Sequence, residues 1–512
     1  APFAYQDVDG RYLGMDKKVH TAEPGYVNYS VFSLWDTFRA LHPLMTIINP
    51  DLATDWGKVL VQGYKEGGIL PKWPLASSYT GCMVGYPAVS VLADLVAKDL
   101  AEGDMSTWAE AGARSSVYRE DLAEKFKGTR ELDLITMHPY YKEKYGFVPA
   151  DSVPESVSWG LEMAYEDWCI SQIAKKAGNM ELANEYAKKA EYYKRYLDPE
   201  TKMMRPVMGD GSFRTPFNPR YSSHMKSDYT EGNAFQWSFF APHDMDNFIA
   251  AIGGKKELET RLDTLFTTSS QIDGAEASGD ITGLISQYAH GNEPSHHMAY
   301  LYNYVGQPWK TQELTRRLLH EMYAPTPEGI IGNEDCGQMS AWYVFSSLGF
   351  YPVCPGSNEF ALTAPQFPKA VVRLANGRTL TVTADNPRRS VYIASVTLDG
   401  KPIDRNYITY DELMQGGELH FALRPRPDYE RGTDDAAAPH SLTRGEVVSI
   451  PYTTQNVSLF TEPLAVALAT TTSGAEIRYT LDGSEPDETS VLYAGPVVVD
   501  RSLTLKARGF KP

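Results

Sequence analysis

The sequence has few of the features that mark zinc-binding, membrane-spanning or nucleic-acid-binding proteins. Its 512 residues include only four cysteines, and no two of them form a CxxC pair, which argues against a zinc site. We find no apolar run of membrane-spanning length and no recognisable leader peptide. Lysine and arginine (48) are outnumbered by aspartate and glutamate (65), and a net charge of -17 would repel nucleic-acid phosphates. We therefore expect no nucleic-acid partner and no membrane span.

The cysteines and the chain ends say little about cellular context. Cys336 and Cys354 could form a disulfide, but the sequence does not decide this, and four thiols in this length do not define a redox compartment. The chain opens on Ala1-Pro2-Phe3 and closes on Lys511-Pro512, in mid-pattern at both ends. We interpret this as processing, or as a chain cut from a longer protein.

Helical patterns dominate from Asp7 to about Phe350. Aromatic residues make up 12% of the chain, with 32 tyrosines and 9 tryptophans, and flat rings suit sugars, although most of them will lie in the core. The sequence predicts a first long helical region that begins at Ser30. Apolar residues at helical spacing predict further helices at 51–66, 86–102, 156–178, 180–197, 232–240, 244–252, 255–266, 295–305 and 311–321. Such helix pairs favour an α/α toroid over an irregular bundle, and the absence of a fixed-period repeat argues against a solenoid.

After Gly356 the pattern changes to alternating, β-branched runs broken by turn residues. We therefore predict a multidomain, mainly α protein, in which a toroid is followed by β-sandwich segments. The expected boundaries are a toroid at 1–360, a β-sandwich at 361–430, a linker at 431–456 and a small C-terminal β domain at 457–512, which could be truncated.

One polar loop stands out because acids lie between two glycines. The stretch from Gly332 to Gly337 holds Asn333, Glu334 and Asp335, and an aromatic-rich helix is predicted to follow and to stop at Gly349. Acids before a helix are favoured by its dipole, so helix capping explains this loop as well as a catalytic role does.

Acids occupy three similar positions elsewhere in the helical region. Asp36 follows Trp35, although it could simply pair with Arg39 one helical turn away. Glu231 lies among aromatic residues, where desolvation would raise its pKa as a general acid requires; the alternative is again a helix cap.

Asn292 and Glu293 lie just before Pro294, and carboxylate and amide oxygens suit a hard cation such as calcium. His296 and His297 would point to different faces of a helix, so they make a poor metal pair, and no HExxH motif is present. A toroid gathers such loops around one pocket, where a protonated and an ionised carboxyl form the set used for glycoside cleavage.

At these residues the sequence resembles glycoside hydrolase family 92, the calcium-dependent exo-acting α-mannosidases. The matching stretches are Ser33-Leu-Trp-Asp-Thr-Phe-Arg, Trp73-Pro-Leu with Cys82-Met-Val-Gly, Thr230-Glu-Gly-Asn-Ala, Gly291-Asn-Glu-Pro-Ser-His-His and Gly332-Asn-Glu-Asp-Cys-Gly-Gln-Met-Ser-Ala-Trp-Tyr-Val-Phe. Residues from about 457 are similar to the C-terminal β domain of chitobiases and hexosaminidases.

The resemblance implies an (α/α)6 toroid that hydrolyses terminal α-mannosides of glycans with inversion. By position, Glu231 matches the general acid and Asp335 the general base, which stand roughly 6.5–9.5 Å apart in inverting enzymes. Calcium in this family bridges two mannose hydroxyls, and Asn292 and Glu293 are the candidate ligands. The candidate substrate-binding residues are Trp35, Asp36, Asn333, Glu334, His297 and Gln338. The family also implies a periplasmic or extracellular, bacterial location.

The sequence departs from the family pattern in three places. Asn333 stands where some members have a second aspartate; an amide cannot take a proton from water, so Asp335 acts alone or with Glu334. Gly291 stands where members acting on α-1,2 linkages tend to have glutamate, which favours another linkage or a broader range. The family's N-terminal β-sandwich is missing here, so it lies on another chain or fragment, or the pocket is incomplete.

Two alternatives to a mannosidase remain open at this stage. A toroid phosphorylase or lyase would need a phosphate site or a Tyr/His base pair, and we find no such motif. A carbohydrate-binding toroid with weak or lost catalysis would explain Asn333 and the missing N-terminal domain.

Overall fold

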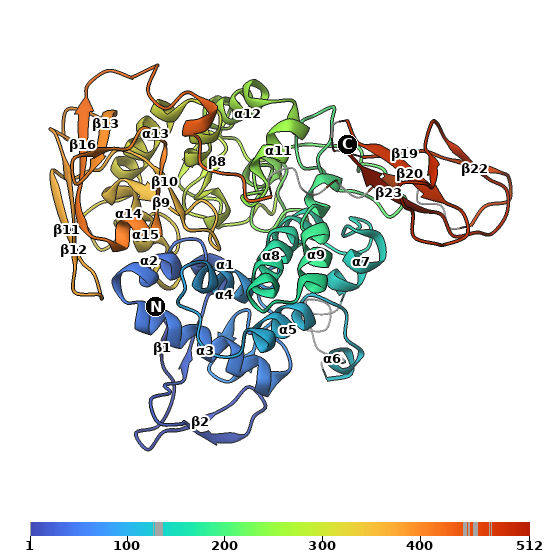
Figure 1. Ribbon diagram of the computed structural model, residues 1–512, viewed down its shortest axis with the longest axis horizontal. Coiled ribbons are helices and arrows are strands. Elements are labelled where there is room, and N and C mark those ends of the chain that lie inside the picture. Colours follow the sequence, from blue (N-terminus) through green and yellow to red (C-terminus); the bar gives the residue numbers. More distant parts are fainter. Residues whose placement is uncertain are drawn as a thin grey trace.

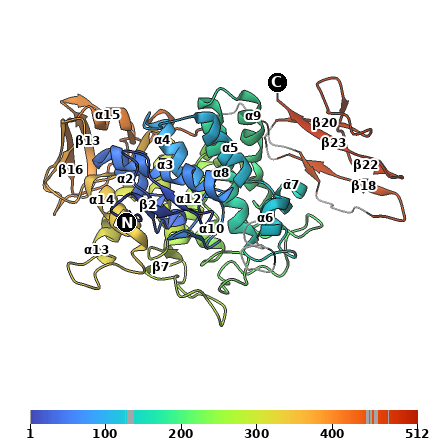
Figure 2. The ribbon, with the colours of Figure 1, turned by 90° about the horizontal axis from the view of Figure 1, so that it is seen from below.

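The computed structural model describes residues 2–125, 127, 137–443, 448, 451–453, 459–470, 472 and 474–511. A helical body forms the centre of the molecule, and β-structure lies at both ends of its long axis (Figure 1). The view turned by 90° shows the same arrangement, with the C-terminal strands projecting beyond α7 (His138–Tyr145) and α9 (Met180–Lys189) (Figure 2). Among the described residues, no helix is both long and apolar enough to cross a membrane.

The first half of the helical body follows short N-terminal strands. The strands are β1 (Phe3–Ala4), β2 (Arg11–Leu13), β3 (Val19–Thr21) and β4 (Tyr29–Ser30), and β5 (Pro74–Leu75) and β6 (Ser78–Tyr79) form a hairpin further on. The helices are α1 (Leu34–Thr37), α2 (Leu41–Ile48), α3 (Pro50–Gly67), α4 (Ala88–Ala97), α5 (Met105–Ser115), α6 (Glu120–Lys125), α7 (His138–Tyr145), α8 (Ser156–Lys176) and α9 (Met180–Lys189).

The second half of the helical body has shorter helices and more turns. The elements are α10 (Ala234–Trp237), α11 (Met245–Ile252), α12 (Lys255–Thr267), β7 (Leu284–Ile285), β8 (Tyr288–Ala289), α13 (Pro308–Glu321) and α14 (Gln338–Leu348), with 3-10 turns at Glu293–Ser295, Met298–Tyr304 and Asp335–Gly337.

The best-predicted helices have clear local signals at their ends. The Asn49 side chain accepts a hydrogen bond from Leu52 N at the start of α3, Pro50 occupies the first turn, and Gly68 ends the helix with a φ of 83°. Gly349 ends α14 in the same way, with a φ of 96°. Helix α8 packs against α4, α5 and α9 at the centre of the core, which explains why most of its residues are buried.

Several predicted helices are shorter than their periodicity indicates. The long helix predicted from Ser30 is broken, because Val31 has a φ of 63° and only four residues of α1 precede α2. The helix predicted at 232–240 is reduced to α10, where Asn233 and Gln236 form a capping box. The segment 295–305 is helical but mostly of the tighter 3-10 type.

Two sheets follow α14. The first has the order β15-β10-β9, and the second has the order β11-β12-β16-β13-β14, in which only β12 and β16 pair in parallel. Their strands are β9 (Phe350–Tyr351), β10 (Glu359–Leu362), β11 (Lys369–Arg373), β12 (Thr379–Ala384), β13 (Tyr392–Leu398), β14 (Lys401–Pro402), β15 (Tyr407–Thr409) and β16 (Gly417–Arg424), with α15 (Tyr410–Met414) between the last two. Gln312 and Arg316 of α13 bond the backbone of the second sheet and its loops.

The described part of the predicted linker packs on the rest of the molecule. Arg431 donates to the carbonyls of Ile403 and Arg405, and Asp435 pairs with Lys255 of α12 at 2.6 Å. Much of the predicted linker after residue 443, together with residues 457 and 458 of the predicted C-terminal domain, lies outside the described residues.

The C-terminal unit consists of small antiparallel sheets. Its strands are β17 (Tyr452–Thr453), β18 (Leu464–Val466), β19 (Leu468–Ala469), β20 (Glu476–Thr480), β21 (Val491–Leu492), β22 (Val497–Val499) and β23 (Lys506–Phe510). All four cysteines are free thiols, so the bridge considered between Cys336 and Cys354 is not formed.

Candidate active site

Three carboxyl groups from distant parts of the sequence meet in the helical body. Asp36 lies in α1, Glu293 opens a 3-10 turn, and Asp335 opens the turn that leads into α14. One carboxylate oxygen from each residue lies within 4.8 Å of the others. We call this group the acid cluster.

The acid cluster is buried and short of positive charge. Burial and the nearby charge of Asp335 raise the pKa of Asp36 to about 8, and burial together with the charge of Asp36 raises the pKa of Glu293 well above its usual range. Both carboxylate oxygens of Glu293 are buried, and within the described part of the chain they have no hydrogen-bond partner. The three groups cannot all be ionised at neutral pH unless a cation joins them.

The nearest arginine is already engaged. Arg39 does not pair with Asp36; its guanidinium donates to Glu162 of α8 at 2.6 Å and to the Trp35 carbonyl at 3.1 Å. The rings of Phe38 and Phe240 lie against the same guanidinium. Its charge therefore favours the ionised forms of Asp36 and Glu293 only from a distance.

The loop that carries Asp335 is sharply bent. Asp335 and Cys336 have φ values of 50° and 57°, in the left-handed region that side-chained residues seldom adopt. The Glu334 carboxylate holds this bend, because it accepts hydrogen bonds from Gly337 N at 2.6 Å and from the Ser340 hydroxyl at 2.7 Å. Glu334 thus caps the 3-10 turn Asp335–Gly337 that leads into α14, and it has a different role from that of Asp335.

This loop also touches the Glu293 loop directly. Gly332 has a φ of 77°, and a Cβ at this position would lie 2.5 Å from the carbonyl oxygen of Gly291. A Cβ at Gly291 would lie 2.0 Å from the Thr282 hydroxyl oxygen. The two loops therefore meet backbone to backbone, which fixes Asp335 relative to Glu293.

Glu231 is the second acidic element of the site. Its backbone is also left-handed, with a φ of 45°, and the Asn292 side-chain amide donates to its carbonyl oxygen at 2.9 Å. Burial raises the pKa of Glu231 to about 8, and the charges of Asp280 and Asp36 add to this shift. Glu231 is therefore protonated near neutral pH, as a general acid must be.

Three of the predicted substrate-binding residues are enclosed in the core. Trp35 is 1% exposed and packs on Trp237 with 6.4 Å between ring centroids. The Gln338 side-chain oxygen accepts from the backbone nitrogens of Ala40 and Leu41, which ties α14 to the start of α2. The His297 ring bonds the carbonyl of Phe239. All three side chains are nearly inaccessible in this structure.

Two family models match this chain. Residues 1–425 match the model of the glycosyl hydrolase family 92 catalytic domain. This chain belongs to glycosyl hydrolase family 92. Residues 452–512 match the chitobiase/β-hexosaminidase C-terminal domain.

Solved members of the family share the fold. An α-mannosidase from Bacteroides thetaiotaomicron, in complex with mannoimidazole, is 40% identical with a TM-score of 0.79, over 86% of this chain and 57% of that chain. An inverting mannosidase of the family from the same organism is 34% identical with a TM-score of 0.75, over 86% and 59%.

A curated relative is more distant. An uncharacterised secreted glycosidase from Arthroderma benhamiae is 25% identical over 75% of this chain and 51% of its own length. The chain thus spans a little over half the length of the relatives it matches.

One site residue was missed by sequence reasoning. Asp280 lies close enough to both Glu231 and Asp335 to raise their pKa values, and its carboxylate accepts from the exposed side chain of Asn333 at 3.5 Å. In the sequence it is an acid in a polar loop, with no aromatic neighbour and no helix start to mark it.

Proposed function

We propose that this chain is the catalytic part of an exo-acting α-mannosidase that removes terminal α-mannosides from glycans with inversion, and that its helical body is an (α/α)6 toroid. One observation carries the proposal: a carboxyl protonated near neutral pH, Glu231, lies in the same site as a cluster of acids that contains Asp335. The names of the two solved relatives support mannose as the sugar.

In the proposed reaction the two carboxyls act on opposite faces of the sugar. Protonated Glu231 gives its proton to the glycosidic oxygen as the bond from that oxygen to the anomeric carbon breaks. Asp335 takes a proton from a water molecule as the water oxygen bonds to the anomeric carbon. The products are β-mannose and the alcohol of the shortened glycan, and the two proton transfers reset when Glu231 and Asp335 exchange protons with solvent.

The acid cluster fits the calcium ion that the family implies. Glu293 offers two buried oxygens that lack a hydrogen-bond partner among the described residues, and Asp36 offers a third oxygen beside them. Hard carboxylate oxygens of this kind are the donors that calcium prefers. Bound calcium would supply positive charge against the acids and coordinate sugar hydroxyls. Asn292, the other predicted ligand, donates its side-chain nitrogen to Glu231.

The proposal extends to location and partners. Mannose-containing glycans at cell surfaces and in secretions are reached by a periplasmic or extracellular enzyme, and the curated relative is named as a secreted glycosidase. We propose the same kind of location for this protein.

The deciding experiment follows the first-formed sugar by NMR. The protein is given an aryl α-mannoside and α-linked mannobioses, with and without EDTA. We expect β-mannose to appear first, and we expect EDTA to stop its release until calcium is added back. Release of α-mannose would contradict inversion, full activity in EDTA would contradict the calcium site, and release of another sugar would contradict the substrate.

A further inference from the structure

A two-step hydrogen-bond chain holds one oxygen of Asp36. The Trp73 indole N–H donates to the Ser33 hydroxyl oxygen at 2.7 Å, and the Ser33 hydroxyl donates to Oδ2 of Asp36. Ser33 and Asp36 are 2% and 4% exposed, so this chain is shielded from water.

The direction of this chain is fixed by chemistry. An indole nitrogen can only donate, so the Ser33 hydroxyl oxygen accepts the hydrogen bond from Trp73. The Ser33 hydroxyl has one proton, so accepting from Trp73 leaves that proton for Asp36. The hydroxyl of Ser33 accordingly favours the ionised form of Asp36 and lowers its pKa, against the effect of burial.

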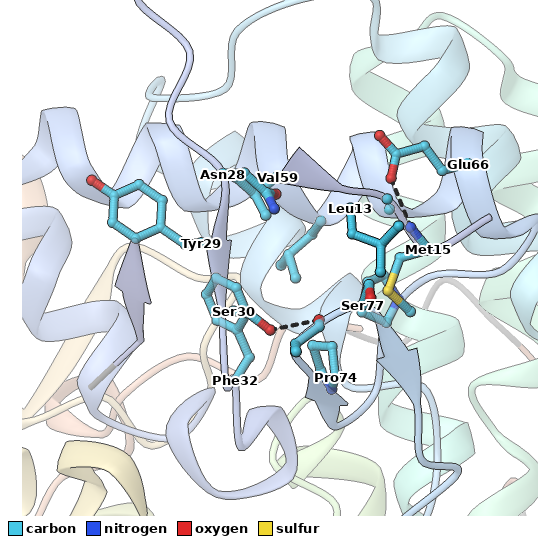
Figure 3. Close-up of a pocket in the computed structure, with 15 residues that line it drawn as sticks. Leu13, Met15, Asn28, Tyr29, Ser30, Phe32, Val59, Glu66, Pro74 and Ser77 are labelled. Atoms are coloured by element: carbon cyan, nitrogen blue, oxygen red, sulfur yellow. Dashed lines mark hydrogen bonds between the residues drawn. The ribbon is translucent and has the colours of Figure 1, made fainter. Parts of the chain in front are cut away.

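Trp73 is itself held by the β5–β6 hairpin. The Thr80 hydroxyl donates to the Trp73 carbonyl at 2.7 Å, and Val31 N donates to the Pro74 carbonyl at 3.2 Å. The Ser30 hydroxyl donates to the Ala76 carbonyl at 2.7 Å. Figure 3 shows Ser30, Phe32 and Pro74 around the cavity beneath this hairpin, which has a volume of about 20 Å³. A cavity of that size holds about one water molecule.

We propose that Ser33 and Trp73 are positioning residues that fix the carboxylate plane of Asp36 and thereby the place of its second oxygen in the acid cluster. A carboxylate with one oxygen held cannot rotate freely, so the other oxygen keeps one direction. Partners of this kind around metal ligands typically contribute about 10–100-fold to metal affinity or activity. The identity of the ligands, calcium and mannose, rests on the proposed function, whereas the hydrogen-bond chain is a feature of the structure itself.

The test compares Ser33→Ala, Trp73→Phe and the double variant with the unchanged chain. Calcium affinity is read from the dependence of the melting temperature on calcium concentration, and kcat and KM are measured on aryl α-mannoside. We expect calcium affinity to fall by about 10–100-fold in Ser33→Ala and by less in Trp73→Phe. Because Trp73 acts through Ser33, the double variant should bind calcium as tightly as Ser33→Ala does.

Trp309→Phe is the matched control. Its indole also donates a hydrogen bond from a partly buried ring, to Gln307 at 2.9 Å, but on α13 and away from the acid cluster. We expect it to change calcium affinity by less than about twofold. Trp73→Phe and Ser33→Ala variants with unchanged calcium affinity and activity would overturn the proposal, as would losses that simply add in the double variant.

The two proposals fail in different ways. If the unchanged chain binds calcium but releases no mannose, the proposed function is wrong, while a weaker calcium site in Ser33→Ala still supports the positioning role. If the unchanged chain releases mannose and the variants match it, the positioning role is wrong and the proposed function stands.

Discussion

Three buried carboxylates of α4 and α8, those of Asp94, Glu162 and Asp167, have cations of their own, whereas the acid cluster has none among the described residues. Asp94 pairs with Lys98 at 2.6 Å, Glu162 with Arg39 at 2.6 Å and Asp167 with Lys142 at 3.0 Å, and all of these side chains are nearly inaccessible. Asp36 and Glu293 are buried and Asp335 is partly exposed, and the three carboxylates lie within 4.8 Å of one another without a lysine or arginine partner in the described part of the chain. We infer that the paired acids have a structural role, whereas the unpaired acids are placed to bind a cation or a substrate.

The largest expected effect comes from removing the proposed base, Asp335, from the acid cluster. Asp335→Asn keeps the size of the side chain but cannot take a proton from water, so we expect kcat to fall by about 10²–10⁴-fold. The measurement is steady-state hydrolysis of aryl α-mannoside, with the melting temperature as a check of folding. If kcat fell by less than tenfold, another carboxylate would be the base, and Asp280 would be the first candidate.

The second prediction concerns a paired acid. Lys142→Met leaves the Asp167 carboxylate buried without its cation, and we expect the free energy of unfolding to fall by about 3–5 kcal/mol. Denaturant unfolding gives this value. The control is Lys256→Met, whose pair with Glu259 involves a lysine side chain that is 83% exposed, and which should cost at most about 1 kcal/mol. Equal losses of unfolding free energy in the two variants would contradict the expected difference between buried and exposed ion pairs.

The third prediction adds the proposed calcium ion to the acid cluster. Calcium at about 100 times its dissociation constant should stabilise the folded chain by about 2.7 kcal/mol, because it binds a site that the unfolded chain lacks. Thermal unfolding with calcium and with EDTA measures the difference. In Glu293→Gln the gain should largely disappear, since a neutral amide replaces the carboxylate. If calcium stabilised this variant as much as the unchanged chain, the ion would bind at another site.

The smallest effect involves a buried base that has no partner. His42 lies between Phe32 and Trp56, neither ring nitrogen has a hydrogen-bond partner among the described residues, and burial lowers its pKa to about 3. In the unfolded chain His42 takes up a proton near pH 6.5, whereas in the folded chain it stays neutral. Protonation therefore favours the unfolded chain, and the free energy of unfolding falls as the pH drops below that value.

His42→Phe should therefore reduce the loss of stability between pH 7 and pH 5 by about 2 kcal/mol. Denaturant unfolding at the two pH values, for this variant and the unchanged chain, gives the result. Identical pH dependence in the two proteins would mean that His42 is reached by water or is protonated in the folded state.

The fold was readable from sequence where local signals and packing agree. The limits of α3 and α14 follow from Asn49, Pro50 and Gly349, whose backbone preferences do not depend on distant contacts. The break at Val31 was not readable, because a left-handed β-branched residue is held there by tertiary contacts that no local pattern reveals.

The candidate site was also predictable from the sequence only in part. Glu231, Glu293 and Asp335 were singled out from their loops, and the structure brings Glu293 and Asp335 together with Asp36. The sequence could not separate a cap from a catalytic acid, and the structure gives the capping role to Glu334. Nor could it distinguish Trp35, which is buried against Trp237, from the partly exposed Trp73, because tertiary packing decides the exposure of each ring.

The contact between Gly291 and Gly332 restricts how this protein can evolve. Any side chain at Gly291 must first displace the Thr282 hydroxyl, and any side chain at Gly332 meets the Gly291 backbone. A change at Gly291 is therefore tolerated only where Thr282 has also changed, which makes these two sites epistatic, whereas no side-chain change elsewhere relieves the backbone contact at Gly332. A library that varies Thr282 together with Gly291 should accordingly yield more folded variants than one that randomises Gly291 alone.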